Sequence, residues 1–124
     1  MKSFSQFLIE SKQSKINDFL QFASNHLGLD DMPRVIIIDS PDFSINNRTF
    51  GCYDMNSDTI KVQTAKRHLM DIFRTLAHEL VHYKQKKSGM ELNGEDGSEH
   101  ENEANSVAAV ILRQYSHNIP NHGY

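Results

Sequence analysis

Residues 65–87 constrain the fold most, because their apolar side chains recur at three- and four-residue steps along a single long segment. The stop signal Gly89 follows this segment. The apolar positions are Leu69, Ile72, Phe73, Leu76 and Leu80. This pattern predicts an amphipathic helix that buries one face in a core and leaves its other side chains for a different task.

The run from His78 to His82 lies on this predicted helix and reads His-Glu-Leu-Val-His, which matches the H-E-x-x-H pattern. Residues four apart share a helix face, so the two imidazoles can bind one Zn²⁺ at roughly 2.0–2.1 Å each. Glu79 is the predicted general base, which takes a proton from a water activated by the metal. Both histidines point away from the apolar face, which disfavours core histidines and leaves exposed surface histidines as the alternative.

A second helix is predicted over residues 98–115, with a serine cap and Glu101 as the capping-box partner. Glu103 is expected on the same face as Val107 and Val110, which we take as the buried side. A buried carboxylate is costly unless it is paired or binds a metal, so Glu103 is the predicted third ligand. Two histidines and one glutamate with an open fourth position are typical of a catalytic zinc site.

Other polar residues near the motif keep two interpretations each. Glu99 either orients a ligand histidine or is solvated at the helix start, where acids suit the dipole. Asp71 and Thr75 lie on the His78 face and are candidates either to line the cleft or to bond to the ligands. The same donor set can hold Fe(II), but the helical motif and its glutamate favour zinc.

The remaining segments predict a helix over residues 3–27, a buried strand over 34–39 and a hairpin of strands 49–53 and 59–63. A Gly-rich loop is expected at 88–97 and a tail at 118–124. The order of helix, small sheet, helix and helix indicates one α+β domain over residues 1–124. We expect a mainly antiparallel sheet packed on the motif helix and on the glutamate-bearing helix.

Charge and composition exclude several classes of protein. The net charge of −3 and the absence of a basic stripe argue against a nucleic-acid partner. The single cysteine, Cys52, cannot form an internal disulfide, which fits a reducing compartment. No run approaches the ~20 apolar residues of a membrane helix, and residues 1–10 lack the pattern of a secretory signal. We expect a cytoplasmic protein without a membrane partner, and its oligomeric state stays open.

The motif helix, followed by Glu101-Asn-Glu-Ala-Asn105 and an alanine-rich helix, resembles the compact zincin peptidases of the gluzincin type. The similarity is greatest to small phage and bacterial metallopeptidases and covers about residues 50–115. It implies zinc bound by His78, His82 and Glu103, with Glu79 as the base. The implied activity is hydrolysis of peptide bonds in a protein or peptide substrate.

The resemblance also implies that the edge strand before the motif helix binds the substrate backbone by strand addition. That strand is expected at 59–63, with substrate-binding residues Thr59, Ile60, Lys61 and Val62. Larger relatives stabilise the oxyanion with a Tyr or His from a further domain, which we do not expect here. One such donor is typically worth roughly 10²–10³ in rate. The unranked candidates for this role are Tyr115, His117, His100 and Tyr53.

The first ten residues resemble the short leader of internal head proteins of tailed phages, which is cut after a Leu-x-Glu type sequence. Leu8-Ile9-Glu10 fits that pattern. The resemblance implies removal of residues 1–10 and packaging in a phage head inside the host cell. The alternative is a first helix that packs on the domain. A second functional hypothesis is a non-catalytic, zinc-stabilised binding module of phage structural or host-takeover type, in which Glu79 would be dispensable.

Overall fold

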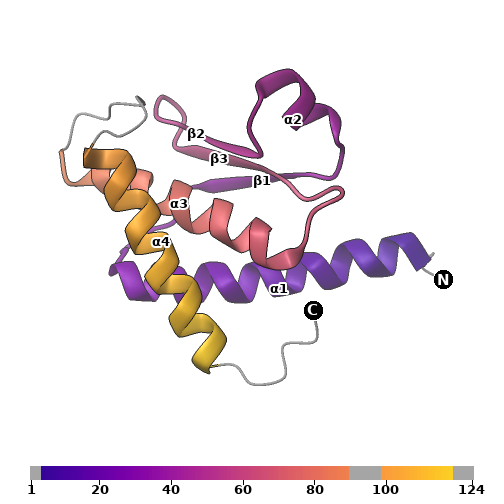
Figure 1. Cartoon of the computed structure of the whole chain (residues 1–124), viewed down its shortest axis with the longest axis horizontal. Helices are drawn as coiled ribbons and strands as arrows, with labels where there is room; N and C mark the ends of the chain where they lie inside the picture. Colours follow the sequence, from indigo (N-terminus) through magenta and orange to yellow (C-terminus); the bar gives the residue numbers. More distant parts are fainter. Residues whose placement is uncertain (1–3, 90–98, 119–124) are drawn as a thin grey trace.

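The computed structural model describes residues 4–89 and 99–118, and the side chains of residues 12–89 and 99–117 (Figure 1). Its elements in chain order are α1 (Phe4–Leu27), β1 (Arg34–Ile38), α2 (Asp42–Asn47), β2 (Gly51–Asp54), β3 (Thr59–Gln63), α3 (Leu69–Lys87) and α4 (Glu99–Asn118). Within this part of the chain, four helices and one three-stranded sheet confirm the predicted α+β class. None of the helices described is long and apolar enough to span a bilayer.

Some sequence predictions fall outside the described residues. The helical cap at Ser98, most of the loop predicted at 88–97 and most of the tail at 118–124 are among them. Residues 4–10 belong to α1. Removal of residues 1–10 therefore stays a prediction, and it would shorten this helix.

The sheet has the order β1-β3-β2, so β3 is the central strand. β2 and β3 pair antiparallel, with Gly51 opposite Val62, which confirms the predicted hairpin. β1 pairs parallel to β3, with Val35 opposite Ile60. The prediction of a mainly antiparallel sheet was therefore wrong, since one of the two pairings is parallel. The parallel pairing is possible because α2 joins β1 to β2 at one end of the sheet, and β2 then returns the chain to the end where β3 begins.

α3 packs on one face of the sheet, and α1 and α4 pack on α3, where an aromatic core joins the three helices. Figure 1 shows α3 between the sheet and α1, with α4 crossing α3. The rings of Phe19 in α1 and Phe73 in α3 stack with centroids 4.4 Å apart. Tyr115 of α4 meets both rings edge-on, at 5.1 and 5.5 Å. This cluster fixes how α4 lies on α3, and that arrangement determines which α4 side chains reach the motif.

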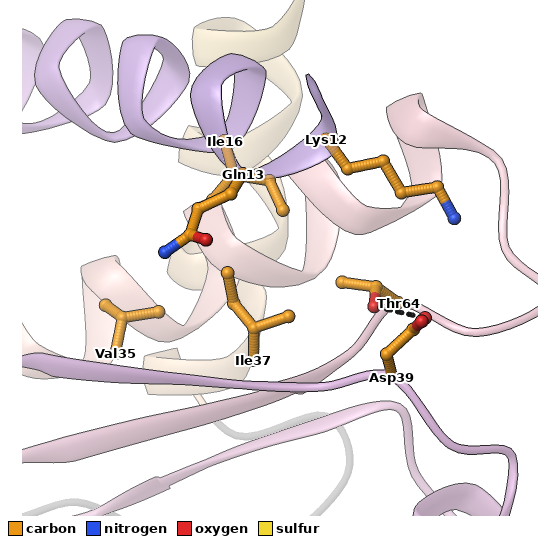
Figure 2. A pocket seen from close by; sticks show the side chains of 7 residues that line it. All are labelled: Lys12, Gln13, Ile16, Val35, Ile37, Asp39 and Thr64. Carbon is orange, nitrogen blue, oxygen red and sulfur yellow. Dashed lines mark hydrogen bonds between the residues drawn. The ribbon is translucent and has the colours of Figure 1, made fainter. Parts of the chain in front are cut away.

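A cavity of about 280 Å³ lies between α1 and β1 (Figure 2). Val35 and Ile37 point from β1 toward α1, and the Thr64 hydroxyl donates to Asp39 at 3.0 Å at one end. The lining residues are Lys12, Gln13, Ile16, Val35, Ile37, Asp39 and Thr64. None of them belongs to the motif, so this cavity is separate from the candidate site described below.

The C-terminal end of α3 anchors the β2–β3 hairpin. Lys86 donates to Asp58 at 2.8 Å and to the Met55 carbonyl at 2.7 Å, and the Tyr53 hydroxyl also donates to Asp58. A matching set binds the connection between α1 and β1 to the same helix end, and its members are Tyr83, Lys87 and Asp31. The hairpin is thus fixed along α3, close to the motif.

Candidate metal centre

Three local features favour the α3 helix, and the helix in turn fixes the positions of the motif residues. They are a capped first turn, lysines in the last turn and a buried apolar face. The His68 side chain caps the first turn by accepting from the Met70 amide at 3.2 Å. Lysines occupy the last turn, where cations suit the helix dipole. The helix begins at Leu69 rather than at the predicted Ala65, since Lys66 has a left-handed backbone with φ of 58°. The predicted apolar residues of this helix are all buried.

His78, His82 and Glu101 form a cluster that could hold a metal ion. The Nε2 atoms of the two histidines lie 3.1 Å apart. The two carboxylate oxygens of Glu101 lie 3.1 Å from these atoms, one oxygen facing each ring. Ligands bound at roughly 2.0–2.1 Å to a tetrahedral ion lie about 3.3 Å from one another. The three donor groups therefore stand almost at the separations that zinc requires.

The hydrogen bonds around His82 indicate which of its ring nitrogens can bind a cation. Gln85 donates through Nε2 to the His100 carbonyl and to Glu103 Oε1, which can only accept. The amide oxygen of Gln85 therefore faces His82 Nδ1, at 2.8 Å, and accepts its proton. In the neutral ring, Nε2 then carries a lone pair that faces Glu101 and His78. These converging lone pairs fit a bound cation.

The third member of the cluster is the carboxylate of Glu101, and the prediction of Glu103 for this place is corrected. Glu103 is exposed, and its carboxylate accepts a hydrogen bond from Gln85 at 2.8 Å. The buried face of α4 consists of Ala104, Ala108, Ile111, Leu112 and Tyr115, whereas Val110 is 38% exposed. Glu101 stands one turn before Ala104 on that inner face. The buried face of α4 is therefore not the face that Val107 and Val110 suggested, and Glu101, predicted only as a capping-box partner, joins the two histidines.

Gln85 was not recognised from the sequence, although it is only 2% exposed. It links His82 to two groups on α4, the Glu103 carboxylate and the His100 carbonyl. Such a partner fixes the tautomer and the orientation of a ligand histidine. Its position three residues after His82, on the same helix face, was the available signal.

Burial governs the charge state of the motif. Burial, aided by the charge of Glu101 and opposed by His82, raises the pKa of Glu79 to about 7. Burial, and next the neighbouring His82, lower the pKa of His78 against the opposing carboxylate of Glu101, which favours its neutral imidazole. A carboxylate with a pKa near neutrality can both accept and return a proton at physiological pH. The group expected to act as a base thus has a suitable pKa.

A shallow cavity of about 250 Å³ opens beside His78 and Glu79. Its walls come from the start of β2, from α3 and from α4, and they comprise Thr49, Phe50, Gly51, Arg74, Thr75, His78, Glu79 and Asn105. Asn105 also hydrogen-bonds to His78 through its side chain, a contact that the sequence did not reveal. Thr75 lines the cavity as expected, whereas the exposed Asp71 pairs with Arg74 at 3.4 Å. A ligand could therefore approach the cluster along the start of β2.

The predicted substrate strand is not available for strand addition. β3 is paired on both sides, by β1 and by β2, so Thr59, Ile60, Lys61 and Val62 cannot take up another strand. The burial of four of its five residues agrees with this central place in the sheet. Of the paired strands described here, β2 forms the edge beside the motif.

The oxyanion-donor candidates lie in four different surroundings. Tyr115 is buried among the core aromatic rings, and His117 is exposed about 24 Å along α4 from Glu101, at 1.5 Å per residue. Tyr53 donates its hydroxyl to Asp58, and burial raises its pKa. His100 is half-buried next to Glu101. The first three therefore do not join the cluster, and only His100 stays near it.

Comparison with family models, with curated proteins and with solved structures finds no match to this chain. The class of site consequently rests on the residues themselves. It is a cluster of two histidines and one glutamate in a mixed α+β chain, arranged so that it could bind a metal.

Proposed function

We propose that the chain is a zinc-dependent peptidase in which His78, His82 and Glu101 hold the metal and Glu79 is the general base. The observation that carries this proposal is the mutual 3.1 Å spacing of the donor groups, immediately beside a buried glutamate on the same helix. Three protein ligands leave a fourth position open, as in catalytic zinc sites. The cavity beside His78 and Glu79 gives a substrate access to that position.

Zinc, when bound, would polarise the scissile carbonyl and make a water more acidic. Glu79 takes the proton from the attacking water as oxygen adds to the carbonyl carbon. The same carboxyl then returns this proton to the amine nitrogen as the C–N bond breaks, leaving a carboxylic acid and an amine. Gln85 keeps His82 in the tautomer that presents Nε2, and Asn105 orients His78.

The edge of β2 is the surface we propose for the substrate backbone. The pairing of Gly51 with Val62, with Gln63 N–H donating to the Phe50 carbonyl, places the backbone groups of Gly51 and Tyr53 toward the outer edge. The Thr49 hydroxyl donates to the Gly51 carbonyl, which leaves Tyr53 as the principal pairing position. An extended peptide added here would run alongside Glu79.

The first experiment measures zinc content and peptide hydrolysis in parallel. Wild type should bind about one zinc per chain. Glu101→Ala should lose most of that zinc, whereas Glu103→Ala, the matched control two residues away, should lose much less. Glu79→Gln should keep zinc and lose hydrolysis. Full zinc affinity in Glu101→Ala would remove the proposed site.

A non-catalytic, zinc-stabilised binding module is the second candidate. It is favoured by one observation, namely that Tyr115, His117 and Tyr53 do not reach the cluster as oxyanion donors. This candidate predicts that Glu79→Gln retains every function of the chain. Loss of a cellular function in a Glu79→Gln variant that still binds zinc would exclude it.

The phage-head location is a separate proposal that rests on Leu8-Ile9-Glu10 alone. It predicts that the chain recovered from virus particles begins at residue 11. Mass spectrometry of the N-terminal peptide tests this, and an intact residue 1–10 segment in particles would refute it.

A further inference from the structure

A second surface depression, of about 490 Å³, adjoins the cavity beside the motif. It is lined by Ser44, Ile45, Arg48, Thr49 and Phe50. Thr49 and Phe50 line both depressions, so the two meet at the segment that leads from α2 into β2. We call the second depression the α2 groove.

The α2 groove carries two large apolar side chains that are unusually open to solvent. Ile45 is 72% exposed and Phe50 is 46% exposed. Neighbouring exposed apolar residues with a polar rim often mark a binding surface. Here they lie at one end of the route to the candidate metal centre.

Phe50 is held rigidly. The guanidinium of Arg67 lies over its ring, 4.3 Å from the centroid, and Arg67 is itself fixed by bonds to the Gln63 and Asp71 carbonyls and the Thr75 hydroxyl. The Phe50 carbonyl accepts from the Gln63 amide at 2.8 Å. A preordered aromatic ring binds a ligand with little loss of side-chain entropy.

α2 is held in place although it buries no residue of its own. The side-chain oxygen of Gln63, itself 2% exposed, accepts from the Ser44 amide at 2.7 Å. The Ser44 hydroxyl donates to the Pro41 carbonyl at 3.1 Å. The neighbouring residue, Ile45, is thus presented outward from a fixed turn of helix without contributing to the core.

We infer that the α2 groove binds a large apolar side chain of an extended peptide whose backbone follows the edge of β2 to Glu79. This inference rests on the proposed peptidase function and adds a substrate class, namely peptides with an aromatic or large aliphatic residue on the α2 side of the cleaved bond. An extended peptide is the occupant because the groove adjoins the cavity at the candidate metal centre and lies at the start of an edge strand. Side chains along such a peptide advance about 3.3 Å per residue, so successive subsites lie along one line.

The test measures peptide binding to zinc-loaded Glu79→Gln, which permits binding without turnover. Fluorescein-labelled peptides carry a single Phe in a Ser/Ala background, and the Phe is moved one position at a time. At one position, on one side of the cleaved bond, the peptide with Phe should have a Kd about tenfold or more lower than the peptide with Ser. This is the gain expected for a buried aromatic side chain.

Two further variants, each combined with Glu79→Gln, locate the preference. Ile45→Asp should reduce the difference between the Phe and Ser peptides to about twofold or less, because it places a charge in an apolar groove. Val110→Asp is the matched control, since Val110 is another exposed apolar residue, on α4, and it should leave the preference intact. Both positions are exposed, so neither change disturbs the core.

The outcomes separate this inference from the proposed function. Peptide binding without preference at any position, or a preference that survives Ile45→Asp, overturns the α2 groove as a subsite. Self-association of the wild type that Ile45→Asp abolishes, without any peptide preference, overturns it in favour of a contact between two copies. A third outcome is a preference for Phe that depends on Ile45, while the zinc-loaded wild type cleaves none of the peptides. This outcome supports the α2 groove as a binding site and refutes the proposed peptidase function.

Discussion

Gly51 of β2 packs closely against Thr75 of α3, and the substitution Gly51→Ala should push the strand away. A Cβ at this position would lie 2.4 Å from Cγ2 of Thr75 and 3.1 Å from the Lys61 carbonyl oxygen. Carbon atoms in favourable contact stand about 3.5–4.0 Å apart, so the strand or the helix must shift by about 1 Å or more. Overpacking of this kind costs about 1–3 kcal/mol of unfolding free energy.

The same shift should lower peptide hydrolysis more than zinc binding. β2 carries the proposed substrate edge, whereas His78, His82 and Glu101 lie on α3 and α4. A misplacement of about 1 Å can cost roughly 10²-fold in rate. We expect kcat/KM of Gly51→Ala to fall by about that factor, with zinc affinity within a few-fold of wild type. Chemical denaturation, chelator competition and a peptide assay measure the three quantities.

Thr75→Ser provides the matched rescue. It deletes Cγ2 but keeps the hydroxyl, which accepts from Arg67 at 2.8 Å and donates to the Asp71 carbonyl at 3.1 Å. Gly51→Ala combined with Thr75→Ser should regain most of the lost stability, leaving only the tight contact with Lys61. Strictly additive effects of the two substitutions, with coupling under about 0.5 kcal/mol, would refute the steric explanation.

Three further predictions concern the metal, the core and pH. Gln85→Leu should weaken zinc binding about 10–100-fold by releasing the His82 tautomer, as measured by chelator competition, and unchanged affinity would mean that the Gln85 bond is incidental. Phe19→Ala should lower the unfolding free energy by about 3–5 kcal/mol, since it empties the site between two aromatic rings, and urea denaturation tests this. Hydrogen bonds from Lys86 and then from Tyr53 hold the pKa of Asp58 below its ordinary 3.8. This group therefore stabilises the fold above about pH 4 and loses that effect as pH falls through the lowered pKa. Asp58→Asn should flatten the acid limb of the stability curve, and an unchanged limb would contradict this assignment.

Local patterns in the sequence predicted most of the local elements, but not the short helix α2. The motif helix, the hairpin and the long first helix follow from periodicity and turn residues over a few positions each. The partner of β1 did not follow, because a continuous β-branched run carries no mark of the strand it joins. The prediction of an edge strand at 59–63 failed for the same reason, since it counted only the hairpin partner.

The choice between Glu101 and Glu103 shows a different limit, because it depends on the contact between two helices. The two residues stand about 200° apart on α4, so the phase of the buried face decides which one meets the histidines. Val107 and Val110 suggested one buried face for α4. The face that is in fact buried is built around Ala104 and Ala108, both essentially inaccessible to solvent. The distance between packed helices depends on the side chains at their contact, and alanines allow a close approach. That approach brings Glu101, one turn before Ala104, within 3.1 Å of both imidazoles. Where two helices meet closely, small residues rather than bulky ones mark the buried face, and a ligand is best sought one turn away from them.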